Sequence, residues 1–340
     1  MAERLNTSVQ IRTLARDLGL RPNDNPVQAI LEFCRRRIVS VLKEAQCRTL
    51  SELLSVMATA LETEIIEIES DDALRELIER MRQRKELGFA GLFERLANPK
   101  LFAVTIRLLN PDPGDRQYVS IIDCRGEKKF RRYFSKWHEL AHLVTLTNQQ
   151  RLVFCRSHEN YVERDPEEQM MDLIAGDAGF FAGIVQSHGK GDLSFDRIEI
   201  LRDELCPEAS LQASLIGFTK AWPSPCILLT ADLAYKKEVE RSLNQPTLDF
   251  VPPPEQQLRV VHVTTNDLAS EKGVHIFPNM RIPESSVIFD VFMGEVPSRE
   301  ADENLKSWCT SDGYTLLPLA VQVYARRIAG TLYALINIRG

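Results

Sequence analysis

The sequence WHELAH at residues 137–142 restricts the structure and chemistry of this chain more than any other segment. On an α-helix, residues four apart lie about 40° apart around the axis and about 6 Å apart along it. His138 and His142 would therefore share one helix face. No Pro or Gly occurs between residues 128 and 153, which favours a helix there. The segment predicts a helix that presents two imidazoles to one metal ion.

Zinc is the metal that this pattern of donors predicts. Hydrolytic zinc sites combine neutral imidazoles with a carboxylate and keep a fourth position for water. Glu139 lies between the two histidines and could remove a proton from that water as a general base. The simpler alternative is that His138 and His142 are structural residues on an amphipathic helix.

Length and composition predict a soluble protein of two or three domains in the reducing cytoplasm. A chain of 340 residues is longer than a domain with a single hydrophobic core usually is. Its seven Cys show no paired spacing, which argues against a disulfide framework. The N-terminus lacks a signal-peptide core, and no apolar run approaches the roughly 20 residues that cross a bilayer. We therefore expect no membrane partner. The net charge of −6 does not indicate a general nucleic-acid-binding surface.

The first part of the chain predicts helices followed by a small sheet, an α+β arrangement. Residues 7–60 have apolar positions at helical spacing, and the β-branched run 64–68 predicts a strand. The charged stretch 71–86 predicts a solvent-facing helix or a flexible insertion. Further strands are predicted at 102–106 and 118–122, directly before the metal-binding helix. An exposed edge strand there could hold an extended peptide substrate through backbone hydrogen bonds.

A third metal ligand is expected from a helix that begins near Pro166, since Pro is favoured at the first position of a helix. A carboxylate from this helix would complete a set of two histidines and one acid. Four acidic residues suit this role by their chemistry: Glu163, Glu167, Glu168 and Asp172. The residue types alone do not choose among them.

The order of these elements resembles the ImmA/IrrE family of metallopeptidases over residues 20–185. The resemblance rests on YFSKWHELAH at residues 133–142, on the strands before it and on the acidic helix after it. Members of this family look like site-specific proteases that cut helix-turn-helix transcriptional repressors. Cleavage relieves repression of stress, mobile-element or defence genes. The implied cofactor is Zn²⁺, and the implied partner is a protein substrate.

The family pattern also implies which carboxylate binds the metal. In the family the third ligand opens a helix of the type Glu-x-x-Ala-Asn/Asp-x-Phe-Ala. Alignment of this pattern on Asp172 and Ala175 places the ligand at Glu168. Met171 and Ile174 stand where the family usually has Ala and Phe, so Glu167 stays the alternative.

The resemblance implies three regions. They are a zincin-like metallopeptidase domain at 1–190, a helical, helix-turn-helix-like segment at 191–244 and a C-terminal α/β GAF-like sensor domain at 245–340. Two functional alternatives stay open. One is a metal-containing regulator without proteolytic activity. The other is a DNA-binding transcription regulator that acts through residues 194–244, although this segment lacks a basic recognition helix.

Cys155 could regulate the predicted site. A thiolate is a strong zinc ligand, so Cys155 could occupy the water position and keep the enzyme latent. The alternative is an apolar strand residue, and His158 is a rival for the same space. An oxyanion donor is also expected, with Tyr133, Tyr161 or an arginine as candidates.

The C-terminal part predicts a linker and a second sheet. Three consecutive prolines within 244–255 favour a stiff extended linker. This part would regulate the peptidase by binding an activating ligand, nucleic acid or a partner surface. His262 and His275 are expected to be ordinary histidines rather than metal ligands. The predicted elements are strands at 259–264, 287–292, 315–324 and 331–338, with a helix at 298–308.

Overall fold

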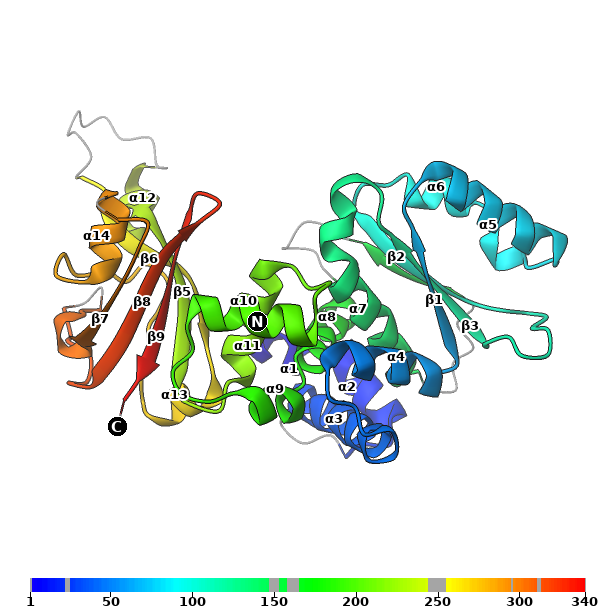
Figure 1. Cartoon of the computed structure of the whole chain (residues 1–340), viewed down its shortest axis with the longest axis horizontal. Helices are drawn as coiled ribbons and strands as arrows, with labels where there is room; N and C mark the ends of the chain where they lie inside the picture. Colours follow the sequence, from blue (N-terminus) through cyan, green and yellow to red (C-terminus); the bar gives the residue numbers. More distant parts are fainter. Residues whose placement is uncertain are drawn as a thin grey trace. The chain divides into compact units, whose positions relative to one another are not determined.

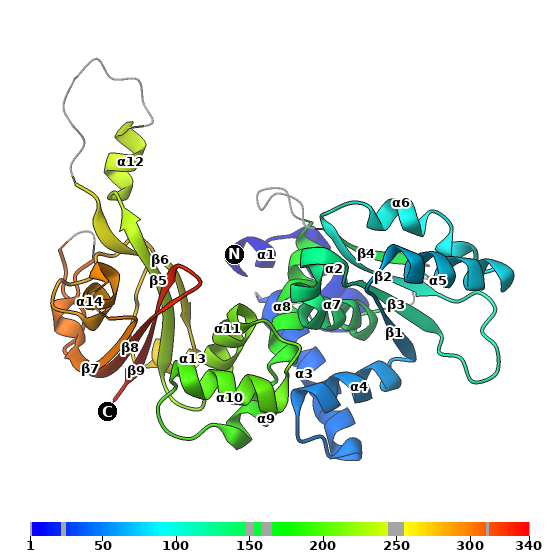
Figure 2. The ribbon, with the colours of Figure 1, turned by 45° about the horizontal axis from the view of Figure 1, so that its top comes forward.

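The computed structural model of the chain contains two compact units, each a mixture of helices and one sheet (Figures 1 and 2). It describes residues 2–21, 25–146, 153–157, 165–243, 255–294, 296–310 and 313–339, without the side chains of 2–3 and 153–157. The α+β class is therefore confirmed. None of the described helices is both long enough and apolar enough to cross a membrane.

The division into units differs from the expected boundaries at 190 and 244. The first unit comprises Met1–Ile184 with Arg202–Ala213, and the second comprises Val185–Leu201 with Ser214–Gly340. The expected helical segment 191–244 is therefore shared between the units, because part of it packs with the first unit and its strand joins the second sheet. Residues 244–254 of the expected linker lie outside the described residues.

Four helices open the first unit, and the three that lie within residues 7–60 agree with the helical spacing of the apolar residues there. They are α1 (Ala2–Asn6), α2 (Val9–Asp17), α3 (Pro26–Ala45) and α4 (Leu50–Ala60). The Asn25 side chain accepts a hydrogen bond from the Gln28 backbone N–H at 3.0 Å, and Pro26 occupies the first position of α3. Thr49 and Glu52 form a reciprocal capping box at the start of α4. These caps pair helix-end N–H groups and so fix where α3 and α4 begin.

The first unit contains a four-stranded sheet in the order β1-β3-β2-β4. Its strands are β1 (Thr63–Ile68), β2 (Leu101–Arg107), β3 (Tyr118–Asp123) and β4 (Val153–Ser157). β1 runs parallel to β3, and the other neighbouring strands are antiparallel. The strands predicted at 64–68, 102–106 and 118–122 are thus confirmed. β4 lies at one edge of the sheet.

Helices cover both faces of this sheet (Figures 1 and 2). One face packs against α5 (Asp71–Gln83), η1 (Leu87–Phe89) and α6 (Leu92–Leu96), in a core that includes Leu77 and Val104. Of the two alternatives for the charged stretch 71–86, the helix is confirmed, because most of its charged residues face solvent while Leu74, Leu77 and Met81 are buried on the sheet. The helix α7 (Arg132–Val144) contacts β2 and β3 from the other face. Since side chains alternate along a strand, Val104 and Thr105 point to opposite faces.

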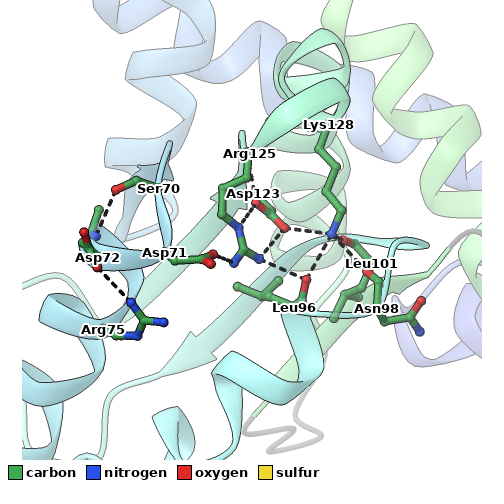
Figure 3. A network of polar contacts seen from close by, with 11 residues as sticks. Ser70, Asp71, Asp72, Arg75, Leu96, Asn98, Leu101, Asp123, Arg125 and Lys128 are labelled. Carbon is green, nitrogen blue, oxygen red and sulfur yellow. Dashed lines mark hydrogen bonds and ion pairs between the residues drawn. The ribbon is translucent and has the colours of Figure 1, made fainter.

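A buried charge network lies where β3 ends and the chain turns toward α7 (Figure 3). Asp123 has a fully buried side chain that pairs with Arg125 Nε and Lys128 Nζ, both at 2.8 Å. Arg125 also pairs with Asp71 at the start of α5, at 2.5 Å. Lys128 Nζ donates to three carbonyl oxygens between α6 and the start of β2. The network therefore ties the turn η2 (Gly126–Arg131), which leads into α7, to β3, α5 and α6.

Asp123→Asn is expected to lower the free energy of unfolding at neutral pH by about 3–5 kcal/mol, because it leaves two largely buried cations without their shared carboxylate. Burial raises the pKa of Asp123, but hydrogen bonds from Arg125 and Lys128 outweigh burial and hold the pKa below its ordinary value. The stabilisation is therefore present above the unfolded-state pKa of about 4 and is lost as the pH falls through the lower folded-state pKa. Urea denaturation at neutral and acid pH measures both effects.

The matched control is Asp72→Asn in the same region. Asp72 pairs with Arg75 on the surface of α5, where the two side chains are 86% and 61% exposed. Exposed pairs stabilise by only about 0–1 kcal/mol, so this variant should unfold almost like the wild type. Equal losses of stability in the two variants would contradict the role given to Asp123.

The second unit contains an antiparallel five-stranded sheet in the order β6-β5-β9-β8-β7. Its strands are β5 (Cys226–Ala234), β6 (Gln257–Thr265), β7 (Ser298–Asn304), β8 (Ala320–Ile328) and β9 (Thr331–Ile338). The strands predicted at 259–264 and 331–338 are confirmed. The one predicted at 315–324 begins only at Ala320, after Pro318, which has no N–H for a strand ladder. The later helices are α9 (Ala182–His188), α10 (Phe195–Leu205), α11 (Leu211–Ala221), α12 (Lys237–Leu243), α13 (Asp267–Glu271) and α14 (Val287–Met293).

Two predictions for the second unit were wrong. The apolar run 287–292, predicted as a strand, forms α14, because short apolar runs suit buried helices and strands equally well. Glu303 fixes the start of this helix by accepting hydrogen bonds from Ser286 Oγ and the Val287 N–H, both at 2.9 Å. The charged segment predicted as a helix at 298–308 begins with β7, the edge strand paired with β8, and continues into η3 (Leu305–Ser307). Tertiary pairing overrides local propensity there.

Candidate metal centre

The helix predicted from the WHELAH sequence is α7, and nearly all of it is buried. Its motif residues His138, Glu139 and His142 are 1%, 0% and 4% exposed. Burying polar groups without hydrogen-bond partners is unfavourable by several kcal/mol, so the partners of these three residues define the site.

A carboxylate from the next helix meets both histidines. This helix, α8 (Pro166–Gly179), begins where the Asp165 side chain accepts a hydrogen bond from the Glu167 N–H at 3.0 Å. Glu168 Oε2 lies 3.1 Å from His138 Nε2, and Glu168 Oε1 lies 3.4 Å from His142 Nε2. The two Nε2 atoms are 3.2 Å apart. His138, His142 and Glu168 thus form a group that could hold a metal ion, with all ligand atoms within 4.8 Å of one another.

This arrangement separates Glu168 from Glu167 and Asp172, two of the other acids that the sequence left open. Glu167 lies on the same helix but does not belong to the group of three donors. Asp172 contacts His138 from the other ring nitrogen, with Oδ1 2.9 Å from Nδ1. Among the described residues, neither His262 nor His275 joins a group of metal donors.

The donor set fits a divalent metal such as zinc. When Asp172 accepts the Nδ1–H of His138, the Nε2 lone pair of that ring is directed toward Glu168 and His142. Burial raises the pKa of Glu168, but hydrogen bonds donated by the two imidazoles in the metal-free site outweigh burial and hold the pKa well below its ordinary value. A bound metal would take the place of these Nε2 protons. The site therefore offers two imidazole nitrogens and one anionic carboxylate, which favours zinc over the oxygen-preferring calcium and magnesium.

Asp172→Ala is expected to weaken metal binding about 10- to 100-fold, because the loss of this contact frees the ring orientation and the tautomer of His138. Competition with a chromogenic zinc chelator measures the dissociation constant. Glu167→Gln is the control, since it removes a carboxylate from the same helix that is not one of the three donors. A similar weakening in both variants would show a general effect of charge on α8 instead of a contact with His138.

Contacts outside the motif hold α7 in its N-terminal half and at its C-terminal end. Lys136, which is 5% exposed, pairs with Glu67 of β1 at 2.5 Å and with Glu208 at 2.6 Å. At the other end, Arg37 of α3 donates through Nη1 to the Val144 carbonyl oxygen at 2.8 Å. These contacts keep the helix that carries the two histidines in place against the sheet.

A chain of buried hydroxyl groups leads across the sheet to Glu139. Thr105 Oγ1 of β2 donates to Glu139 Oε2 at 2.6 Å. Ser120 Oγ of β3 lies 2.7 Å from Thr105 Oγ1, and Thr63 Oγ1 of β1 lies 3.1 Å from Ser120 Oγ. Because each hydroxyl has one proton and Thr105 gives its proton to Glu139, Ser120 donates to Thr105 and Thr63 donates to Ser120. The aligned hydroxyls fix one oxygen of Glu139 in a buried environment.

These three hydroxyl residues were missed by sequence reasoning. The available signal was one small polar residue, Thr105 or Ser120, inside each of two apolar strands, whereas Thr63 is the first residue of β1 and gave no such signal. On the face toward α7, buried hydroxyls are unfavourable without partners, so such residues point to a polar group on the helix that packs there.

Other expected site residues have separate positions. Tyr133 is buried, and its hydroxyl donates to the Gly179 carbonyl oxygen at 2.6 Å, so this donor joins α7 to α8 instead of facing an oxyanion. Cys155 lies in β4 opposite Val104, and its side chain is outside the described part of the chain. His158, Tyr161 and Glu163 also lie outside the described residues.

Comparison with known proteins does not assign a family. No protein-family model matches the chain, and a search of curated proteins found no match.

Proposed function

We propose that this chain is a zinc-dependent endopeptidase of the ImmA/IrrE type that cleaves a helix-turn-helix transcriptional repressor and so derepresses stress, mobile-element or defence genes. In this proposal the first unit is the zincin-like peptidase and the sheet of the second unit is a GAF-like regulatory domain. The observation that carries the proposal is the convergence of His138, His142 and Glu168 beside Glu139 of the same helix.

Each residue of the site has a distinct role in peptide hydrolysis. His138, His142 and Glu168 would hold the zinc ion, and Asp172 would orient His138. The chemistry that zinc supplies when bound is Lewis acidity, which polarises a peptide carbonyl group and favours deprotonation of water. Glu139 accepts the proton of the attacking water and delivers it to the leaving amine. The Thr105 hydroxyl holds the carboxylate of Glu139 in one orientation during these transfers.

One observation favours hydrolysis over a structural metal site. A structural site needs no buried carboxylate next to its ligands, yet Glu139 is fully buried there.

The edge strand β4 suits an extended peptide. It pairs with β2 on one side, and within the described ranges no strand pairs with its other side. The backbone groups of such an edge can add a peptide as a further strand. DNA binding through the helical segment is less well supported, because α10 carries four acidic residues against two arginines.

The test is cleavage of a repressor by the zinc-loaded chain. Small helix-turn-helix repressors encoded beside this gene are the substrates to try, and mass spectrometry of the fragments locates the cut. We expect one cleavage site and complete protection by a zinc chelator. Repressors that stay intact with zinc-loaded protein would contradict the proposed substrate class.

A further inference from the structure

The second unit contains a pocket of about 450 Å³ that is separate from the residues of the metal centre. Three segments line it: the start of α12 at 236–241, the turn 277–280, and the residues Thr310 and Tyr314. Cationic side chains and aromatic rings from these segments therefore line the same pocket. A volume of several hundred Å³ is typical of sites for small ligands.

Two aromatic rings at this pocket are open to solvent. Phe277 is 55% exposed and Tyr314 is 74% exposed. Large apolar rings are usually buried, so two exposed rings at one pocket are a feature to explain. Their faces can stack on a flat ring of a ligand.

The turn that carries Phe277 is held by several hydrogen bonds. Pro278 and Asn279 occupy its central positions, and Asn279 has a φ of +72°, as the second of these positions requires in a type II turn. The Asn279 N–H donates to the Val260 carbonyl oxygen at 2.7 Å, and Arg259 Nη1 donates to the Asn279 carbonyl oxygen at 2.8 Å. The Phe277 ring is therefore presented by a backbone that is already fixed to β6.

The other two walls are also held in place. The Asn279 side chain donates to the Tyr235 carbonyl oxygen at 2.9 Å and accepts from the Lys237 N–H at 3.3 Å, which ties the turn to the start of α12. The Thr310 N–H donates to the Tyr314 carbonyl oxygen at 2.8 Å, and the Tyr314 N–H donates to Thr310 Oγ1 at 3.1 Å. A preformed pocket lowers the entropy that is lost on binding.

The pocket carries a net positive charge in a protein whose net charge is −6. Its charged residues are Lys236, Lys237, Arg241 and Glu238. Glu238 pairs with Lys236 at 3.2 Å. Lys237 and Arg241 form no salt bridge with a carboxylate that the structure describes, and both cations line the pocket, where they would attract an anion.

We propose that this pocket binds a nucleoside 5′-phosphate, with the base stacked on Phe277 or Tyr314 and the phosphate held by Lys237 and Arg241. An aromatic platform beside cationic side chains is the combination that recognises a base and its phosphate together. The volume suits one nucleotide better than a strand, and the acidic character of the whole chain opposes a long nucleic-acid footprint. The proposal is independent of the metal centre and of proteolysis.

Calorimetric titration of the full chain with AMP, GMP, CMP and UMP tests the proposal. We expect saturable binding of at least one of them, weaker binding of the matching nucleoside and of inorganic phosphate, and lower affinity as salt rises. Phe277→Ala should weaken binding about 5- to 150-fold, since stacking on an aromatic ring contributes about this factor. Arg241→Ala should weaken binding and also reduce its salt dependence.

Two matched controls exclude general effects of these substitutions. Phe130 is 56% exposed, close to the value for Phe277, and lies in the first unit. Lys306 is an exposed cation of the second unit that is not among the residues lining the pocket. Phe130→Ala and Lys306→Ala should bind like the wild type. No saturable binding of any mononucleotide, binding of only a short single-stranded oligonucleotide, or equal losses in the controls would overturn the proposal.

Discussion

Glu139→Gln is expected to slow repressor cleavage by about 10²- to 10⁴-fold, the usual effect of losing a general acid–base group. The amide is nearly the same size as the carboxylate, and its oxygen can still accept the hydrogen bond that Thr105 donates at 2.6 Å. It cannot take a proton from water. The expected loss is therefore in the chemical step, with the fold and the metal site intact.

The measurement combines cleavage rates with metal content. Fragment formation under single-turnover conditions gives the rate of the chemical step, and elemental analysis gives zinc per chain. Glu139→Gln should lose activity and keep zinc, whereas Glu168→Gln should lose both, because Glu168 is a member of the donor group. Glu167→Gln, its neighbour outside this group, should keep both.

The result separates the peptidase from its closest rival. In a metal-containing regulator without proteolytic activity, Glu139 would be a structural acceptor for the Thr105 hydroxyl. Glutamine would preserve that hydrogen bond, so the regulator would function normally in the variant. Full derepression by Glu139→Gln in cells would thus favour the regulator over the peptidase.

The helix of the metal centre could be predicted from sequence because its determinants are local. Positions 138 and 142 share a face at helical spacing, and no residue in the segment breaks a helix. The choice of Glu168 among four acids needed the family pattern, since the approach of α8 to α7 depends on packing far along the chain. The structure places Glu168 between the two imidazoles.

The hydroxyl chain to Glu139 could not be derived in this way. It depends on the strand register that pairs Thr105 with Ser120, and on β1 lying parallel to β3. Neither pairing follows from residue spacing, because a shift by one residue would turn these side chains to the opposite face. The strand predicted at 287–292 was wrong for a related reason. The local apolar pattern there suits a strand as well as the helix α14 that the chain forms.

The pocket of the second unit shows the same dependence on tertiary structure. Lys237, Phe277 and Tyr314 are far apart in sequence, and the turn through Asn279 brings the first two together. The sequence contains these residue types in many other places. Only their meeting at one cavity makes them a candidate site.

His142→Ala is expected to reduce the metal content from about one zinc ion per chain to almost none. Removal of Asp172, which only contacts a ligand, should weaken binding about 10- to 100-fold, and loss of a donor atom should have a larger effect. Purification in buffer without chelator, followed by elemental analysis of wild type and variant, gives the stoichiometry. His262→Ala is the control, because His262 is exposed and lies outside the donor group.

Thermal unfolding with added zinc provides a second readout that needs no substrate. A ligand present at about 100 times its dissociation constant stabilises the native state by about 2.7 kcal/mol, which corresponds to several degrees in Tm for a unit of this size. Wild type and His262→Ala should show this shift, and His142→Ala should not. Equal metal content in all three proteins, or none in any of them, would mean that α7 and α8 do not form the metal site. Since Glu139 has a role in hydrolysis only beside such a site, that result would remove the peptidase as well and leave the nucleotide pocket as the remaining candidate for function.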